Sequence, residues 1–238
     1  MTINNVEMRD RIIRNALKLG ADLAGIARVE ELKRSPSHQK YKSKPYYDFF
    51  ERLPPYPEAA RAVLVFAVHH PRGQPELDWW DPKPGGTPGN RELIKVQKQI
   101  KKWLVGELEI NSTSLPYKLE KGGIFLKDAA VLSGVGIIGK NNLLLTQEYG
   151  SHVRMRAMFL DVSVEPTPRL NFSPCDDCDM PCFQACPQDA FRSGAYDRDL
   201  CQIQMRINED NVSPHPGDPE IEHVRYCRAC EFACPVGR

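Results

Sequence analysis

Two short stretches, CDDCDMPCFQACP at residues 175–187 and CRACEFACP at residues 227–235, decide what the C-terminal part of this chain holds. Together with Cys201 between them, they contain all eight cysteines of the 238-residue chain, and each stretch ends in Cys-Pro. Thiolates bind iron strongly, and a [4Fe–4S] cubane takes four of them. Eight cysteines therefore predict two [4Fe–4S] clusters with no cysteine left over.

The spacing predicts that the ligands cross between the two stretches. The bacterial ferredoxin run reads Cys-x2-Cys-x2-Cys-x3-Cys-Pro, and its fourth cysteine serves the other cluster. The first stretch departs from this pattern by one residue, because three residues and not two precede its third cysteine. We expect one cluster at Cys175, Cys178, Cys182 and Cys234, and the other at Cys186, Cys201, Cys227 and Cys230.

Two other interpretations of the cysteines compete with this one. Zinc is also bound by Cys-x2-Cys pairs in fours, but a zinc site requires neither the Cys-Pro endings nor the isolated Cys201. Disulfides also use an even number of cysteines, but disulfide-dense chains are usually small and secreted. This chain is long enough to build a hydrophobic core of its own.

Composition narrows the cellular setting and the class of partner. The net charge is +1, so bulk electrostatics demand neither nucleic acid nor a membrane surface. No stretch of about 18 apolar residues is present, which predicts no membrane span. The first 20 residues lack the apolar core of a signal peptide. We therefore expect a cytoplasmic protein, where thiols stay reduced.

The remaining sequence predicts an α/β (α+β) body over residues 1–170, followed by a ferredoxin-like module over residues 171–238. The run ARAVLVFAVHH at residues 60–70 is the clearest strand, because it is apolar and rich in β-branched residues. Residues 71–90 are rich in Pro and Gly, as a loop would be. Helices are expected at residues 1–20, 91–109 and 126–133, and further strands near residues 23–27, 142–146 and 153–163.

A glycine motif, GVGIIG at residues 134–139, matches G-x-G-x-x-G. In a dinucleotide site a strand precedes this motif and a helix follows it. Here the preceding LKDAAVLS favours a helix and the following IIGKNNLLL an extended chain. A P-loop is excluded because Asn141, and not Ser or Thr, follows Lys140. Two interpretations of the motif remain. It forms a tight turn whose main chain lies close to a bound group, or it is a plain helix-to-strand turn with Gly134 as the C-cap.

The segment GVGIIGKNNLLLTQEYGS at residues 134–151 resembles the corrinoid-binding stretch of epoxyqueuosine reductases and reductive dehalogenases. Those enzymes have a similar Gly-x-Gly-x-x-Gly-Lys-Asn, a Leu pair and a Tyr-Gly-Ser. The arrangement of the cysteines, including the isolated Cys201, is also similar to theirs. The resemblance extends over most of the chain, but only the glycine segment and the cysteines are specific to it.

The resemblance implies a flavin-reductase-like corrinoid-binding body and a double [4Fe–4S] module that relays electrons to cobalamin in its base-off state. Glycines allow the main chain to approach the corrin edge, and Lys140 and Asn141 can donate to corrin amide oxygens. In the ordinary alternative, Lys140 is a solvated surface charge. The residues carried over as corrinoid contacts are Gly136, Gly139, Lys140, Asn141, Leu143, Leu144, Gly150 and Ser151.

The resemblance also implies a catalytic acid. Epoxyqueuosine reductases have an acidic residue about sixteen positions before the second glycine of the motif, and that spacing leads to Glu120, where they tend to have Asp. A carboxylic acid that faces an apolar pocket has a raised pKa and can donate a proton. A surface ion pair with Lys118 or Lys121 is the ordinary alternative for Glu120.

Several functions fit these features. The first is a cytoplasmic oxidoreductase that uses cobalamin and [4Fe–4S] clusters on an unknown small-molecule substrate, with an external electron donor. The second is an electron-transfer protein without its own corrinoid, or one that reduces another corrinoid protein. The third is a zinc-stabilised binding module. The chain ends at Arg238 without the helical region that epoxyqueuosine reductases use with tRNA, and it lacks a basic patch. We therefore do not expect nucleic acid or a membrane as a partner.

Overall fold

The computed structural model describes residues 4–42 and 56–237, except for the side chains of residues 41, 42 and 120. The chain forms two compact units. Unit 1 comprises Met1–Val68, Lys95–Ile137 and Met155–Asn171, and unit 2 comprises His69–Ile94, Ile138–Arg154 and Phe172–Arg238. Helices and strands both occur, which confirms the α+β class. The division into residues 1–170 and 171–238 stays a prediction.

A four-stranded sheet organises unit 1. Its strands are β1 (Leu23–Arg28), β2 (Ala62–His69), β6 (Val153–Leu160) and β3 (Ser112–Ser114), in the order β1-β2-β6-β3. β1 and β2 are antiparallel, with Leu23 opposite Ala67, and β3 and β6 are antiparallel as well. Residues 62–67 of β2 are buried without alternation, as expected for a strand that is covered on both faces.

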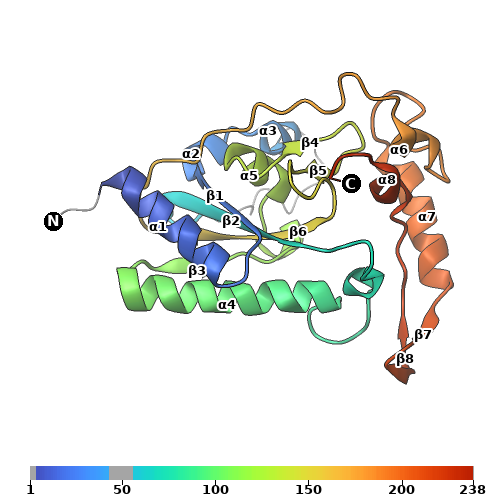
Figure 1. Ribbon diagram of the computed structural model, residues 1–238, viewed down its shortest axis with the longest axis horizontal. Helices are drawn as coiled ribbons and strands as arrows, with labels where there is room; N and C mark the ends of the chain where they lie inside the picture. The colour runs from blue at the N-terminus through green and yellow to red at the C-terminus, as the bar shows by residue number, and fades with distance from the viewer. Residues whose placement is uncertain (1–3, 43–55, 238) are drawn as a thin grey trace. The chain divides into compact units, whose positions relative to one another are not determined.

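The helices of this unit cover the sheet (Figure 1). α1 (Asn5–Lys18) packs on β1, and the Gln97 side chain of α4 (Pro88–Leu108) donates to the Ala157 carbonyl of β6. α2 (Val29–Leu32) and α5 (Leu126–Leu132) contact each other and β1, while α3 (Pro36–Lys42) follows α2. The Asn4 side chain caps α1 by accepting from the Glu7 amide.

The helices and strands of this body lie close to their predicted positions. In α1, Ile12 and Ala16 are fully buried, but Val6 and Leu17 are 45% and 41% exposed. A helix buries only the arc that faces its sheet, and both residues lie outside that arc.

Gly25 of β1 allows the closest approach between the sheet and the end of α5. A Cβ at this position would overlap the carbonyl oxygen of Ser133 and would lie 3.2 Å from Val135 Cγ2. The sequence places no other residue type there because only glycine leaves room for that carbonyl.

Gly25→Ala is expected to destabilise the protein by about 2 kcal/mol, because the main chain must move to admit the methyl group. Thermal unfolding followed by circular dichroism measures the loss as a lower midpoint. Gly106→Ala is the control, since no atom lies within 4 Å of a Cβ at that position of α4. An alanine there favours the helix, so the control should unfold at the same or a higher temperature. Equal unfolding midpoints for the two variants would contradict the close approach of Gly25 to the Ser133 carbonyl.

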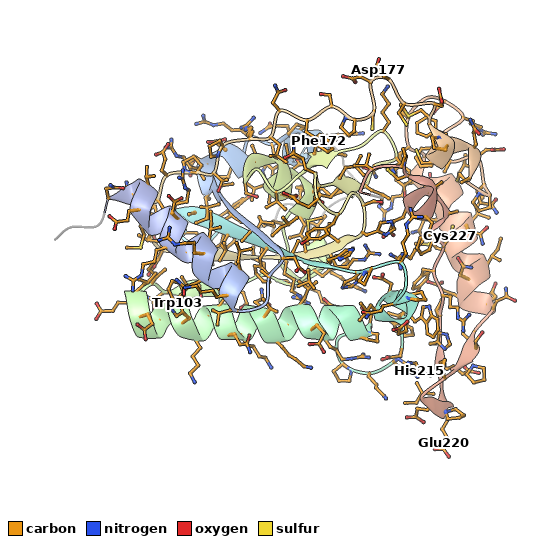
Figure 2. The ribbon with its side chains drawn as sticks, viewed as in Figure 1. Trp103, Phe172, Asp177, His215, Glu220 and Cys227 are labelled. Carbon is orange, nitrogen blue, oxygen red and sulfur yellow. The ribbon has the colours of Figure 1, made fainter. Side chains whose placement is uncertain are left out.

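Unit 2 contains short elements joined by loops. They are η2 (Pro75–Asp78), β5 (Leu144–Leu145), α6 (Pro181–Gln184), α7 (Arg198–Asp210), β7 (Ser213–His215), β8 (Asp218–His223) and α8 (Ala229–Ala233). α7 and the β7–β8 hairpin were not predicted from the sequence. Figure 2 labels His215 and Glu220 on this hairpin and Cys227 closer to α8.

Among the described residues, no helix combines the length and apolar character that a membrane crossing requires. The longest helix is α4, with 21 residues, and it carries Lys or Arg at several positions.

Candidate functional site

The thiols of the first predicted cluster set lie within electrostatic reach of one another. Burial raises the pKa of Cys182, and the thiols of Cys234, Cys178 and Cys175 raise it further. Cys182 and Cys234 are also the two most buried cysteines, at 5% and 4% exposure. The structure therefore brings the last cysteine of the second stretch next to three cysteines of the first.

The second predicted set is grouped in the same way. Burial raises the pKa of Cys230 to about 12, and Cys227, Cys201 and Cys186 are among the neighbours that add to the rise. Cys186 comes from the first stretch and Cys201 from α7. Crossed ligation requires that thiols from both cysteine stretches lie near one another in each of the two predicted sets.

No cysteine forms a disulfide. Among the described residues, no three His, Cys, Asp or Glu side chains surround one point closely enough to hold a single metal ion. A cubane is a body of four irons and four sulfides, so its ligands stand around that body and do not converge on one atom.

Local contacts hold the cysteine stretches in shape. Pro181 opens α6 at the helical position where its missing N–H is no loss. The Asp197 side chain caps α7 by accepting from two backbone amides of its first turn. The Ala190 amide donates to Cys186 Sγ at 3.3 Å, and Asn208 Oδ1 accepts from the Cys227 amide at 3.0 Å. Hydrogen bonds to sulfur are one means by which a protein sets the potential of an iron–sulfur cluster.

The glycine segment forms tight turns, as predicted. Gly134 has φ +69° directly after Ser133, the C-cap of α5, so it takes the left-handed position that ends that helix, and Gly136 precedes β4 (Ile137–Ile138). The Gly139 amide donates to the Leu143 carbonyl. Leu143 is partly buried and Leu144, in β5, is buried. No strand precedes the motif and no helix follows it, so the dinucleotide fingerprint lacks its structural context.

Asn141 has an amide with an unused donor. The residue is 3% exposed, and its Oδ1 accepts from the Leu143 amide at 3.2 Å. Its Nδ2 has no hydrogen-bond partner among the described residues. A buried polar atom without a partner is costly, so its presence indicates that something absent from the structure pairs with it.

Three other predicted contacts lie against the cysteine stretches. Lys140 Nζ donates to the Cys175 carbonyl at 3.1 Å, and Ser151 Oγ donates to the Glu231 carbonyl at 3.2 Å. Gly150 has φ +52°, and a Cβ there would overlap the Val236 carbonyl. The glycine segment thus contacts the main chain of both cysteine stretches, at Cys175 in the first and at Glu231 in the second. Its sequence alone did not indicate this role.

A network of buried charges adjoins the second cysteine stretch. Glu231 on α8 pairs with Arg228 at 2.6 Å and Arg154 at 3.1 Å. Asp78 pairs with the same two guanidinium groups, at 2.6 Å and 2.8 Å, and with His70 Nδ1 at 2.9 Å. Burial alone would raise the pKa of Glu231, but its hydrogen bonds and the two arginine charges hold that pKa well below its ordinary value.

The pKa of Asp78 is also lowered. Burial opposes the shift, and the His70 hydrogen bond and the charges of Arg154 and Arg228 outweigh it. His152 Nδ1 lies 3.4 Å from Glu231, at the edge of hydrogen-bonding distance, and no closer partner for it lies among the described residues.

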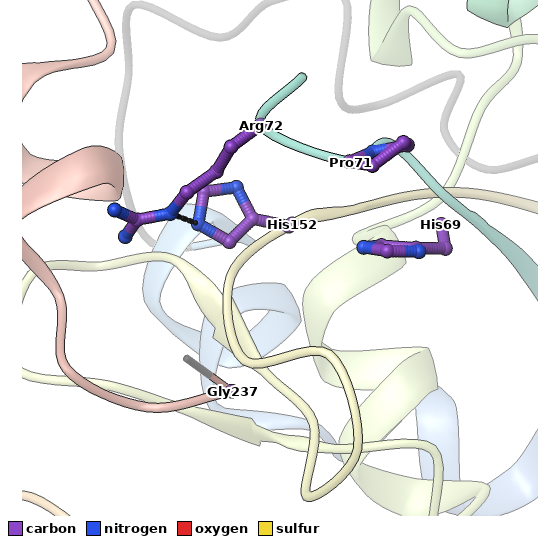
Figure 3. A pocket seen from close by; sticks show the side chains of 5 residues that line it. All are labelled: His69, Pro71, Arg72, His152 and Gly237. Carbon is purple, nitrogen blue, oxygen red and sulfur yellow. Dashed lines mark hydrogen bonds between the residues drawn. The ribbon is translucent and has the colours of Figure 1, made fainter. Parts of the chain in front are cut away.

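An open hollow of about 420 Å³ lies beside this network (Figure 3). His69, Pro71, Arg72, His152 and Gly237 line it. Arg72 Nε donates to His152 Nε2 at 2.9 Å, which leaves the proton of that imidazole on Nδ1. A guanidinium and two imidazoles give the hollow a polar wall. The His69 ring stacks on Tyr149 at 4.5 Å.

Glu120 lies in η3 (Leu119–Lys121) of unit 1, and its side chain is outside the described residues. Its role as a proton donor stays a prediction. Gly122, with φ +91°, is the left-handed C-cap of this short helix, two residues after Glu120.

Sequence reasoning missed the charged network. Its members come from residues 70–78, 152–154 and 228–231, which no single motif contains. One signal was available, because Arg228 and Glu231 are three residues apart inside a cysteine stretch, on one side of a helical turn.

The fold is the one found in solved epoxyqueuosine reductases and reductive dehalogenases. The epoxyqueuosine reductase of Streptococcus thermophilus is 19% identical and superposes over 98% of this chain and 67% of its own, with a TM-score of 0.67. A structure of epoxyqueuosine reductase with an epoxyqueuosine-modified tRNA stem loop superposes over 97% of this chain and 65% of its own, at 17% identity and a TM-score of 0.66.

A reductive dehalogenase whose structure suggests a mechanism for B12-dependent dehalogenation superposes over 79% of this chain and 26% of its own. It is 14% identical, with a TM-score of 0.55. At these identities the likeness concerns the fold alone.

The sequence relatives are epoxyqueuosine reductases, which confirms the resemblance expected from the motifs. The protein of Listeria monocytogenes is 31% identical over 117 residues, which are 48% of this chain and 30% of the relative. That of Cyclobacterium marinum is 24% identical over 99% of this chain and 81% of its own length. This chain thus spans about a third of the first relative and most of the second. No protein-family model matches the chain.

Proposed function

We propose that this chain is a reductase that depends on two [4Fe–4S] clusters and on base-off cobalamin. The observation that carries the proposal is the combination of two crossed thiol neighbourhoods with a glycine segment whose buried Asn141 amide has an unused donor. When bound, the clusters supply one-electron transfer and reduced cobalamin supplies Co(I), a strong nucleophile and reductant.

The residues present fit both groups. Cys175, Cys178, Cys182 and Cys234 would hold one cluster, and Cys186, Cys201, Cys227 and Cys230 the other. Asn141 Nδ2 would donate to an amide oxygen of the corrinoid, and the main chain at Gly136 and Gly139 would lie against its edge. Lys140, Leu143, Leu144, Gly150 and Ser151 complete the proposed strip, three of them by supporting the cysteine stretches.

We further propose an epoxyqueuosine-containing tRNA stem loop as the first substrate to test. The support is the name of the sequence relatives and the fold shared with an epoxyqueuosine reductase solved with such a stem loop. This proposal replaces the expectation that nucleic acid is not a partner. Two-electron reduction of an epoxide also consumes two protons, which calls for an external electron donor and a proton source such as Glu120.

An anaerobic cobalamin titration tests the reductase assignment. The protein is reconstituted with iron and sulfide, cobalamin is added, and the absorption spectrum is followed before and after reduction. A base-off spectrum that converts to Co(I) is the expected result. Cluster absorption with no change in the cobalamin spectrum would contradict the proposal and leave the electron-transfer protein as the function.

The substrate is tested separately with the loaded protein and a chemical reductant. Mass spectrometry of the modified stem loop should show loss of the epoxide, and an unmodified stem loop is the control. An intact epoxide, with Co(I) formed normally, would reject the tRNA substrate and retain the reductase.

A further inference from the structure

The carboxylate of Glu231 is held by two arginines at once. Arg228 donates from Nε and Nη2 at 2.8 Å and 2.6 Å, and Arg154 donates from Nη1 and Nη2 at 3.2 Å and 3.1 Å. Both pairs are bidentate, which is the strongest arrangement of a carboxylate with a guanidinium. Glu231 therefore has one fixed orientation.

A second carboxylate closes the network. Asp78 bridges the same two arginines, because it pairs with Arg154 Nε at 2.8 Å and with Arg228 Nη1 at 2.6 Å. Arg228 also lies 4.6 Å from the centre of the Phe232 ring. Both arginines are thus held between two carboxylates, with Arg228 11% and Arg154 31% exposed.

Stability alone gives no reason for this network. Glu231 and Asp78 have side chains that are 6% and 9% exposed, and Arg228 is 11% exposed. Burying such charges costs several kcal/mol per ion, and apolar residues of similar volume often give equal or higher stability. Unlike apolar side chains, these charges act electrostatically on a neighbouring redox group.

Its position suggests the role. Arg228 lies between Cys227 and Cys230, and Glu231 directly follows Cys230. Arg72 ties the end of the same stretch to the network, because it donates to the Phe232 carbonyl at 2.7 Å and to His152 at 2.9 Å. Charges beside a cluster are among the means by which a protein sets its potential.

We propose that the charges of Glu231, Asp78, Arg228 and Arg154 lie beside the cluster of Cys186, Cys201, Cys227 and Cys230, and that this network sets the reduction potential of that cluster. The inference rests on the cluster assignment of the proposed function. Reduction adds negative charge to the cluster, so each carboxylate lowers the potential and each guanidinium raises it.

The test is an EPR-monitored redox titration of the reconstituted full chain. Glu231→Gln keeps the shape of the side chain and removes its charge, so the midpoint potential should rise. Arg154→Gln removes a positive charge and should lower it. We expect at least a tenfold change in the ratio of reduced to oxidised cluster in each variant, which is about 59 mV for one electron.

Asp81→Asn is the matched control, because Asp81 forms a bidentate pair with Arg91 at 2.9 Å and 2.7 Å and is 2% exposed. It neutralises one buried, arginine-paired carboxylate without touching the cysteine stretches, so the cluster potential of this variant should equal that of the unaltered protein. Opposite shifts in the two network variants support the inference. Unchanged cluster potentials in both network variants would overturn the inference. If Glu231→Gln does not fold, an unchanged potential in Arg154→Gln alone would overturn it. An unaltered protein without iron would instead reject the cluster assignment.

Discussion

Replacing Cys234 by serine is expected to remove one of the two clusters and about half of the iron. Serine is a poor ligand for iron, and Cys234 lies in the thiol neighbourhood of Cys182, Cys178 and Cys175. The cluster that is lost should therefore be the one whose other ligands lie in the first stretch, although Cys234 itself lies in the second. Iron content after anaerobic reconstitution measures the loss.

Double variants distinguish crossed from uncrossed ligation. If the ligands cross, Cys234→Ser combined with Cys175→Ser affects one cluster and retains about half of the iron. Cys234→Ser combined with Cys230→Ser affects both clusters and retains almost none. Uncrossed ligation predicts the reverse order, because Cys234 and Cys230 would then share a cluster. The single variant Cys230→Ser, which should also retain about half of the iron, is the control.

Gly139→Val is expected to weaken cobalamin binding at least tenfold, about 1.4 kcal/mol, while the iron content stays unchanged. A Cβ at this position would lie 2.6 Å from Leu145 Cδ1 and 2.8 Å from Asn141 Oδ1. The larger valine would have to displace the Asn141 side chain, whose Nδ2 is the proposed donor to the corrinoid. The anaerobic titration, read as a dissociation constant, measures the effect.

Gly106→Val is the control for this substitution. It introduces the same side chain into α4, where a Cβ meets no atom within 4 Å. Its cobalamin affinity should equal that of the unaltered protein. If Gly139→Val binds cobalamin normally, the glycine segment is not part of the corrinoid site.

The sequence predicted the elements that bury an apolar face. The helix over residues 91–109 was inferred from the helical period of five residues. Four of them are buried in α4 and the fifth is partly buried; the four are Leu93, Val96, Ile100 and Leu104, and the fifth is Trp103. The strand around Val63–Val68 was inferred from a continuous apolar run, which is what burial on both faces produces. Periodicity works where burial is regular, since it records burial and not backbone conformation.

The helix α7 was missed for the same physical reason. It buries no residue, and two of its large apolar side chains, Ile203 and Ile207, are each 43% exposed. A helix that carries a cluster ligand and lies beside other cysteine segments does not require an apolar face of its own. The sequence signal that remained was the Asp197 cap, which is a weak one by itself.

The candidate site residues that the sequence indicated are those that lie close together in the sequence. The cysteines and the glycine segment are motifs, so their spacing indicated a cofactor class. The charged network is assembled from three distant segments, and Ser151 and Gly150 act through contacts with α8 and Val236. Such contacts depend on the tertiary fold, which local pattern does not encode.

Iron, acid-labile sulfide and zinc, measured on the same anaerobically reconstituted sample, test the central claim most directly. Two cubanes bound by eight thiols require about eight irons and about eight sulfides per chain, with no zinc. A colourless protein that contains zinc and no iron would contradict the account.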